Sequence, residues 1–120
     1  MSSSKLGFGM MRLPQRSPEA TDIDFEQVSQ MVDRFLAAGF TYFDTSWTYH
    51  NGASETAVKR CLVSRHPRDS FVLASKLPTF AITKEEEAEE IFNQQLERCG
   101  VDYFDYYLLH NVNWMRLRLY

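Results

Sequence analysis

The sequence predicts an α/β fold built on a parallel sheet, and three observations support this prediction. Stretches with the character of strands alternate along the chain with stretches of helical periodicity. The apolar run at residues 71–74 lacks polar alternation, as expected for a strand buried on both faces. Asp44, Lys76 and His110 follow successive predicted strands at intervals of about 30 residues, the length of one βαβ unit.

Four elements are expected in the first half of the chain: a strand, a helix, a strand and a helix, over residues 5–11, 24–38, 40–43 and 54–63. The first helix has boundary signals at both ends, because Asp22 or Asp24 can cap its N-terminus and Gly39 follows its last turn. Ser54 is expected to cap the second helix.

Three further elements are expected in the second half: a strand, a helix and a strand, over residues 71–74, 83–99 and 104–109. Thr83 and Glu86 have the spacing of a capping box, and Gly100 ends the helix. Several glutamates crowd the first turns of this helix, where the helix dipole favours them. They are interpreted as a solvated face rather than a metal site: Glu85, Glu86, Glu87, Glu89 and Glu90.

Composition and charge narrow the functional class. The chain has 120 residues, of which 44% are hydrophobic and 24% charged, with a net charge of −3, and these values are ordinary for one globular domain. Its basic residues are scattered, so the sequence predicts neither nucleic-acid binding nor a polybasic membrane patch. No apolar run approaches the roughly 18 residues of a membrane span, and no secretory signal is visible. A cytoplasmic protein is expected.

The two cysteines are expected to be free thiols in a reducing compartment. Cys61 and Cys99 lie far apart, each beside apolar positions of a predicted helix. Neither has metal-ligand spacing to the other or to the three histidines, so no metal site is predicted.

Polar residues that follow parallel strands meet at one edge of the sheet, where α/β folds bind their ligands. Asp44, Lys76 and His110 are therefore expected to be neighbours, together with Tyr49, which follows Asp44 by five positions. Each residue alone also has a structural interpretation. Asp44 could cap a loop, Tyr49 could pack against Trp47, Lys76 could be solvated, and His110 could be a core histidine. Four such residues at one edge favour a functional site.

These four side chains together suit acid catalysis. A lysine ammonium beside a tyrosine favours the phenolate, so Tyr49 would be a usable acid near neutral pH. Asp44 would keep Lys76 charged and oriented, and a neutral His110 could donate a hydrogen bond to a carbonyl oxygen. The group contains neither a nucleophile nor a metal. The bond-making partner is therefore expected to be a cofactor, most simply a hydride donor.

Four segments of the sequence together resemble the first half of the aldo-keto reductase superfamily: GFGMMRLP, FDTSWTYHNGASE, FVLASKLP and GVDYFDYYLLHNVN. Proteins of this superfamily are (β/α)8 barrels of the TIM-barrel type that use NADPH or NADH to reduce carbonyls. The sequences of these segments are most similar to those of bacterial members. The resemblance implies a partial aldo-keto reductase domain over residues 1–120, of about four strands and three helices. The family pattern ends at Asn113, and residues 114–120, WMRLRLY, form an atypical tail.

The resemblance assigns a role to each of the four polar residues. It implies that Tyr49 donates a proton to a small-molecule carbonyl substrate, that Lys76 and Asp44 tune Tyr49, and that His110 orients the substrate.

The resemblance also implies a cofactor, NADPH or NADH. Gly9, Met10 and Met11, at the end of the first strand, would lie against the nicotinamide ribose, which Asp44 also reaches.

A complete barrel needs roughly 200 residues or more, whereas this sequence holds four strands. A natural half-barrel, a truncation and a frameshift all fit that pattern. The phosphate-binding loops of such barrels follow strands seven and eight, so the chain by itself is expected to bind NADP(H) weakly or not at all. Its first and fourth strands would be open edges, which predicts self-association or poor solubility.

Two other functions are compatible with parts of the sequence. A non-catalytic half-barrel, acting as an interaction module or a pseudoenzyme fragment, is the main alternative, because one fold hosts many functions. A phosphate-binding loop at GFGMM is a poorer candidate, because no glycine fingerprint opening a helix follows the strand.

Overall fold

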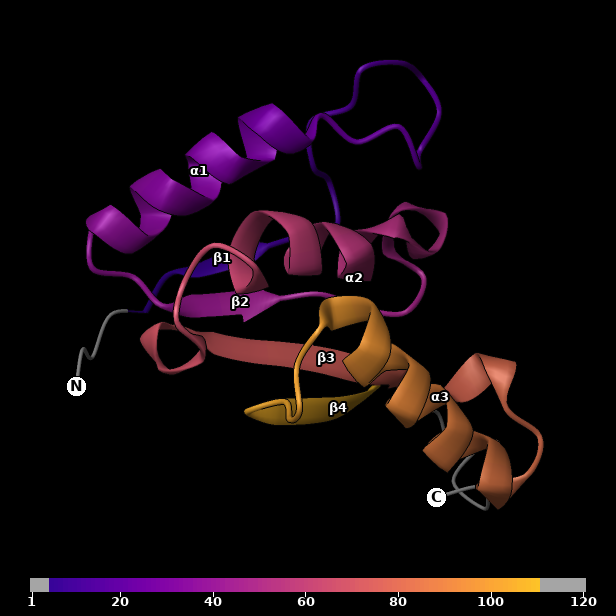
Figure 1. Ribbon diagram of the computed structural model, residues 1–120. Helices are drawn as coiled ribbons and strands as arrows, with labels where there is room; N and C mark the ends of the chain where they lie inside the picture. Colours follow the sequence, from indigo (N-terminus) through magenta and orange to yellow (C-terminus); the bar gives the residue numbers. More distant parts are fainter. Residues whose placement is uncertain (1–4, 111–120) are drawn as a thin grey trace.

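The computed structural model describes residues 5–110, which form one parallel sheet with helices between its strands (Figure 1). The strands are β1 (Gly7–Gly9), β2 (Tyr42–Asp44), β3 (Val72–Pro78) and β4 (Tyr106–His110). The helices between them are α1 (Phe25–Ala37), α2 (Ala53–Val58) and α3 (Glu85–Cys99). The predicted alternation of strands and helices is thereby confirmed.

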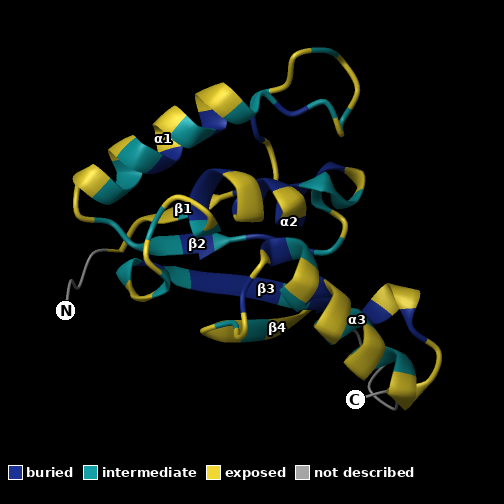
Figure 2. Ribbon diagram, in the orientation of Figure 1, coloured by how far each residue is buried: buried dark blue, intermediate teal, exposed yellow. Residues whose placement is uncertain are grey.

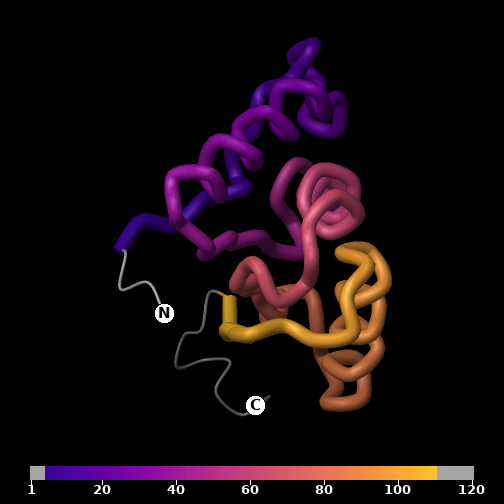
Figure 3. Tube along the Cα trace, turned by 60° about the vertical axis from the view of Figure 1, so that its left-hand side comes forward, coloured from indigo at the N-terminus to yellow at the C-terminus, as the bar shows by residue number. Residues whose placement is uncertain are grey.

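The strands lie in the order β1-β2-β3-β4, and every neighbouring pair is parallel. A sheet in which each strand lies beside its predecessor, with a helix in each connection, is half of a (β/α)8 barrel. In Figure 3 the helices lie together along one side of the strands.

The hydrophobic core lies between the helices and the sheet. Val28 and Val32 of α1 are fully buried, as are Phe43 and Leu73 of the two central strands. At the start of α1 the carboxylate of Asp24 accepts a hydrogen bond from the backbone N–H of Gln27 at 3.1 Å. Asp24, rather than Asp22, is therefore the N-cap of the predicted helix.

The second helix begins differently from the prediction. Tyr49–Gly52 form a 3₁₀ turn, and Gly52, with φ of +96°, is the residue before α2. The side chain of Ser54 lies inside α2 and is fully buried, where it donates to the backbone oxygen of Met10 at 2.8 Å. The expectation that Ser54 caps the helix is wrong, because its hydroxyl bonds to the end of β1 instead. A π turn at Lys59–Val63 extends the helix.

The capping residue of α3 is one position later than predicted. Glu87, not Glu86, accepts hydrogen bonds from the backbone N–H and the hydroxyl of Thr83 and from the backbone N–H of Lys84, each at 2.9 Å. These bonds lower the pKa of the Glu87 carboxyl. Gly100, with φ of +71°, ends the helix as predicted.

The strands β2, β3 and β4 extend further at their carboxyl ends than predicted, whereas β1 is shorter than the strand predicted over residues 5–11. Asp44 and His110 are the last residues of β2 and β4, and Lys76 lies inside β3. The prediction that these residues come after the ends of their strands is therefore wrong. For Lys76 and His110 the reason is that β3 and β4 remain paired as far as Pro78 and His110. The predicted tail at residues 114–120 lies outside the described residues.

The side of the sheet turned away from the helices is open. Figure 2 shows β3 largely buried and β4 largely exposed. Tyr106 and Leu108 of β4 are 57% and 45% exposed, although both are large and apolar. In a closed barrel this face lines the interior. Over residues 5–110, no helix is long and apolar enough to cross a membrane.

Candidate active site

The four predicted residues meet at the carboxyl end of the strands, around the ammonium group of Lys76. Lys76 Nζ lies 3.0 and 2.9 Å from the two carboxylate oxygens of Asp44, 2.9 Å from the backbone oxygen of Thr45 and 3.0 Å from Tyr49 Oη. The side chains of Lys76 and Asp44 are 13% and 30% exposed. The ammonium is therefore nearly enclosed by acceptors, with a carboxylate balancing its charge.

The hydrogen bond between Lys76 and Tyr49 has a defined direction. A lysine ammonium has three donors and no acceptor, so the phenol oxygen of Tyr49 accepts. The phenolic proton then points away from Lys76 and is available to another acceptor. The ammonium also lies 4.6 Å from the centre of the Tyr49 ring.

A turn of unusual backbone conformation holds Tyr49 in place. His50 and Asn51 have φ of 54° and 51°, and Gly52 follows with φ of +96°. Such a conformation costs about 1–2 kcal/mol for a non-glycine residue. The buried His50 ring compensates, because its Nε2 accepts from the backbone N–H of Leu13 and its Nδ1 donates to the backbone oxygen of Ala20, both at 2.8 Å.

His110 reaches the same site from the end of β4. Its ring centre lies 6.0 Å from that of Tyr49, edge to face, and 5.6 Å from that of Phe80. Its Nδ1 lies 2.9 Å from the hydroxyl of Ser46. Burial and the nearby Lys76 ammonium lower the pKa of His110, so the imidazole is neutral at physiological pH.

A buried polar cluster lies behind Lys76, and the sequence did not predict it. The carboxylate of Glu55, fully buried on α2, accepts from Ser75 Oγ at 2.8 Å and from Gln95 Nε2 at 2.9 Å. Gln95 Nε2 also donates to the backbone oxygen of Lys76 at 2.8 Å. Burial raises the pKa of Glu55 in spite of these hydrogen bonds. The cluster ties β3 at Lys76 to two helices.

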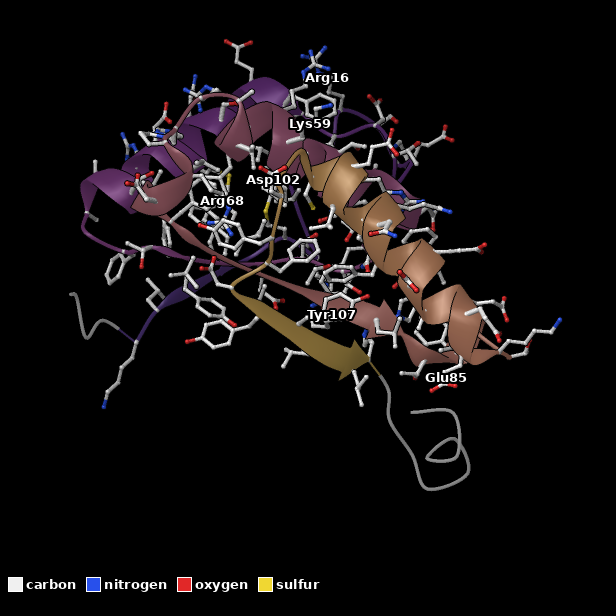
Figure 4. The ribbon with its side chains drawn as sticks, turned by 60° about the horizontal axis from the view of Figure 1, so that its bottom comes forward. Arg16, Lys59, Arg68, Glu85, Asp102 and Tyr107 are labelled. Atoms are coloured by element: carbon white, nitrogen blue, oxygen red, sulfur yellow. The ribbon has the colours of Figure 1, made fainter. Side chains whose placement is uncertain are left out.

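Residues of α3 and β4 complete this cluster. Arg98 forms an ion pair with Glu55 at 3.4 Å, and its guanidinium stacks 3.7 Å from the centre of the Trp47 ring. Tyr107 donates a hydrogen bond to Gln95, which closes the cluster against the outermost strand. Figure 4 shows Tyr107 between β4 and α3.

The residues predicted to touch a cofactor differ in their exposure. An added Cβ at Gly9 would meet nothing within 4 Å, so open space lies beside it, and Met11 is 49% exposed. Met10 is fully buried, and its backbone N–H and oxygen are bonded to Asp44 and Ser54. Gly9, Met11 and Asp44 therefore fit a ligand at this edge, whereas the side chain of Met10 belongs to the core.

The cysteines match the prediction of free thiols. Cys61 and Cys99 are both buried and unpaired, and burial raises the pKa of each thiol. Within residues 5–110 no cluster of histidine, cysteine and acidic side chains is suited to holding a metal ion.

Fold and site together define half of an α/β barrel with a lysine-centred polar site at the carboxyl ends of its strands. The model of the aldo/keto reductase family matches residues 5–114. The chain belongs to this family of oxidoreductases.

Individual relatives agree with this assignment. An aldo-keto reductase from Mycolicibacterium smegmatis is 34% identical over 92 residues, which cover 74% of this chain and 30% of that protein. The crystal structure of an aldo-keto reductase from Klebsiella pneumoniae in complex with NADPH superposes with a TM-score of 0.70 at 26% identity, covering 87% of this chain and 34% of the other. The holo form of an aldo-keto reductase from Bacillus halodurans gives a TM-score of 0.70 at 28% identity, covering 88% and 35%. The chain spans about a third of the length of these relatives.

Proposed function

We propose that this chain carries the proton donor and the positioning groups of an NAD(P)H-dependent carbonyl reductase, with Tyr49 as the acid. The observation that carries the proposal is the 3.0 Å hydrogen bond from Lys76 Nζ to Tyr49 Oη, on an ammonium that Asp44 holds with both carboxylate oxygens. A cation fixed at a phenol oxygen stabilises the phenolate that remains after proton transfer.

The four residues divide the work on a carbonyl group. The cofactor, NADPH or NADH, supplies a hydride to the carbonyl carbon when it is bound. Tyr49 gives its phenolic proton to the carbonyl oxygen, so the product is an alcohol and the oxidised cofactor. Lys76 and Asp44 stabilise the tyrosinate left behind. The neutral imidazole of His110 donates a hydrogen bond that orients the carbonyl oxygen, and the reverse sequence oxidises an alcohol.

The cofactor would lie over the carboxyl ends of β1 and β2. Gly9 leaves room for a ring or a ribose, Met11 is accessible, and Asp44 offers carboxylate oxygens to hydroxyl groups. The complex of the Klebsiella pneumoniae relative with NADPH supports a nicotinamide cofactor. The phosphate groups in such barrels are held by loops after strands seven and eight, so we propose that the 120-residue chain alone binds NADP(H) weakly.

The substrate is proposed to be a small carbonyl compound with an apolar or aromatic part. Phe80, beside His110 and 37% exposed, provides an aromatic surface at the site. Trp47 lies on the loop that leads to Tyr49, and its ring stacks on the Arg98 guanidinium.

A chimera tests the proposed function. Residues 5–110 of this chain would replace the first four strands and three helices of the Klebsiella pneumoniae relative, whose remaining part would supply the other half of the barrel. Oxidation of NADPH in the presence of aromatic and aliphatic aldehydes is expected. The control is the same chimera with Lys76→Met, in which turnover should fall because the phenolate loses its cation.

The alternative function, a non-catalytic half-barrel that acts as an interaction module, predicts a different result. A folded chimera that binds NADPH but reduces no carbonyl would favour the alternative and contradict the proposed chemistry.

A further inference from the structure

Ser46 lies two residues beyond the end of β2 and is fully buried. Its hydroxyl contacts the site through His110, because Oγ lies 2.9 Å from Nδ1 of that residue. Ser46 and His110 are 64 positions apart in sequence, so the contact depends on the fold bringing the end of β2 and the end of β4 together.

The number of protons available to Ser46 Oγ and His110 Nδ1 determines which of the two atoms donates. A neutral imidazole has one N–H donor and one bare nitrogen that accepts, and a serine hydroxyl has one proton. A buried hydroxyl needs an acceptor for that proton. Within residues 5–110, Nδ1 of His110 is the hydrogen-bond partner of Ser46 Oγ. If Nδ1 carried the imidazole proton, the serine proton would be buried without an acceptor, which costs about 1–3 kcal/mol.

We propose that Ser46 is a positioning residue that fixes the tautomer of His110, donating its hydroxyl proton to Nδ1 so that the imidazole proton resides on Nε2. The role of that Nε2–H as the donor that orients a carbonyl oxygen rests on the proposed function. The assignment of the tautomer itself does not.

The surroundings of His110 keep its imidazole neutral and restrict its rotation, so one tautomer can be favoured. Burial and the Lys76 ammonium hold the pKa of His110 below its ordinary value, while the Asp44 carboxylate opposes them. The ring is therefore neutral at physiological pH, where one nitrogen must be bare. The rings of Tyr49 and Phe80, whose centres lie 6.0 and 5.6 Å from that of His110, limit rotation of the imidazole.

The same chain contains an internal reference with the opposite tautomer. Nε2 of His50 accepts from the backbone N–H of Leu13, so its proton must reside on Nδ1, which donates to the backbone oxygen of Ala20. The two histidines should therefore give contrasting nitrogen spectra in one sample.

The test is a ¹⁵N NMR spectrum of the 120-residue chain labelled at histidine, recorded at neutral pH in solution, or in the solid state if the chain self-associates. His110→Gln and His50→Gln variants assign the signals. We expect a protonated Nε2 and a hydrogen-bonded bare Nδ1 for His110, with the reverse pattern for His50. A protonated Nδ1 on His110 in the unchanged chain would overturn the proposal.

Variants of Ser46 separate its hydroxyl from its packing. In Ser46→Ala the Nδ1 signal should move to that of a nitrogen without a hydrogen bond, a fraction of Nδ1–H should appear, and the titration midpoint of His110 should rise, because a hydrogen bond to the neutral form has been lost. Ser46→Thr, which keeps the hydroxyl, should preserve the original spectrum. An unchanged His110 spectrum in Ser46→Ala would contradict the proposal.

A matched control excludes a general effect of losing a buried hydroxyl. Ser75→Ala removes a buried serine that bonds to Glu55 rather than to His110, and it should leave the His110 tautomer unchanged. If Ser46→Ala does not fold, the spectrum of the unchanged chain still decides the question. The measurement needs neither cofactor nor substrate, so failure of the chimera to reduce carbonyls would contradict the proposed function without affecting this result.

Discussion

Each acceptor around Lys76 contributes to what Tyr49 can do. The ammonium of Lys76 donates hydrogen bonds to the Asp44 carboxylate, the backbone oxygen of Thr45 and the phenol oxygen of Tyr49. Because all of its donors have partners, Lys76 is oriented, and the phenolic proton of Tyr49 is the one left to transfer. Tyr49 is therefore the candidate acid because of its hydrogen bond with Lys76. The presence of a tyrosine in the sequence would not by itself be sufficient.

His110 gives a pH-dependent prediction at the same scale. Its folded-state pKa is lowered from the ordinary 6.5, mainly by burial. Below that ordinary value the unfolded chain takes up a proton that the folded chain resists. The free energy of unfolding should therefore fall as the pH drops from about 6.5 toward the lowered pKa. Urea midpoints measured from neutral to mildly acidic pH, for the unchanged chain and for His110→Gln, isolate this contribution.

His110→Gln should show a weaker loss of stability with acidification than the unchanged chain. Parallel pH profiles for the two proteins would contradict the lowered pKa.

At the scale of elements, Glu55 joins α2, β3 and α3. Its carboxylate bonds to Ser75 and Gln95 and pairs with Arg98. Burial raises the pKa of Glu55 more than its hydrogen bonds and the Arg98 guanidinium lower it. The cluster thus fixes the position of β3 next to Lys76 at the expense of a buried charge.

Glu55→Ala should destabilise the chain by about 2–4 kcal/mol, because it leaves buried donors on Ser75 and Gln95 and an unpaired Arg98. Arg98 is partly exposed, so the expected loss of stability is smaller than for a fully buried pair. The measurement is urea unfolding followed by circular dichroism. Glu90→Ala, an exposed change on α3, is the control and should have little effect. Equal stability of the two variants would show that the cluster is not structural.

The helices and strands were predictable from local sequence patterns. The proximity of the four polar side chains was predictable from the topology of a parallel sheet. Periodic apolar residues and glycine stops define α1 and α3, and parallel strands bring Asp44, Lys76 and His110 to one edge. Strand ends were less predictable, because pairing with β4 extends β3 beyond its apolar run.

The supporting contacts could not be predicted from local patterns. Ser75, Gln95 and Ser46 bond to partners 20, 40 and 64 residues away. No spacing rule links such positions, and a buried serine or glutamine resembles a surface one in sequence. The left-handed backbone of His50 and Asn51 has a weak signal in the sequence, because asparagine followed by glycine favours such a turn.

At the scale of the whole molecule, the described chain has an open sheet face and two open edges, on β1 and β4. Large apolar side chains on that face are exposed, among them Tyr106 and Leu108. We therefore predict that the purified 120-residue chain self-associates in a concentration-dependent way. Sedimentation velocity over a range of concentrations measures this directly.

Leu108→Lys, on the open face, should reduce the association. Met31→Lys, at an exposed position of α1, is the control and should not. A monodisperse, cooperatively folding monomer at all concentrations would contradict the prediction.

Cofactor binding also depends on the whole molecule. We predict that calorimetry detects weak or no binding of NADPH to the 120-residue chain, because the anchoring phosphate loops of such barrels come from strands seven and eight. The chimera with the Klebsiella pneumoniae relative should bind NADPH measurably. Tight binding to the 120-residue chain by itself would be the contrary result.

The central claim is that Tyr49 is the acid that protonates the carbonyl oxygen, and Tyr49→Phe in the chimera tests it most directly. The substitution removes the phenolic proton while leaving the ring, so NADPH affinity should be preserved. Carbonyl reduction should fall by about 10²–10⁴-fold, the usual contribution of a general acid. Turnover equal to that of the unchanged chimera would contradict the assignment of Tyr49.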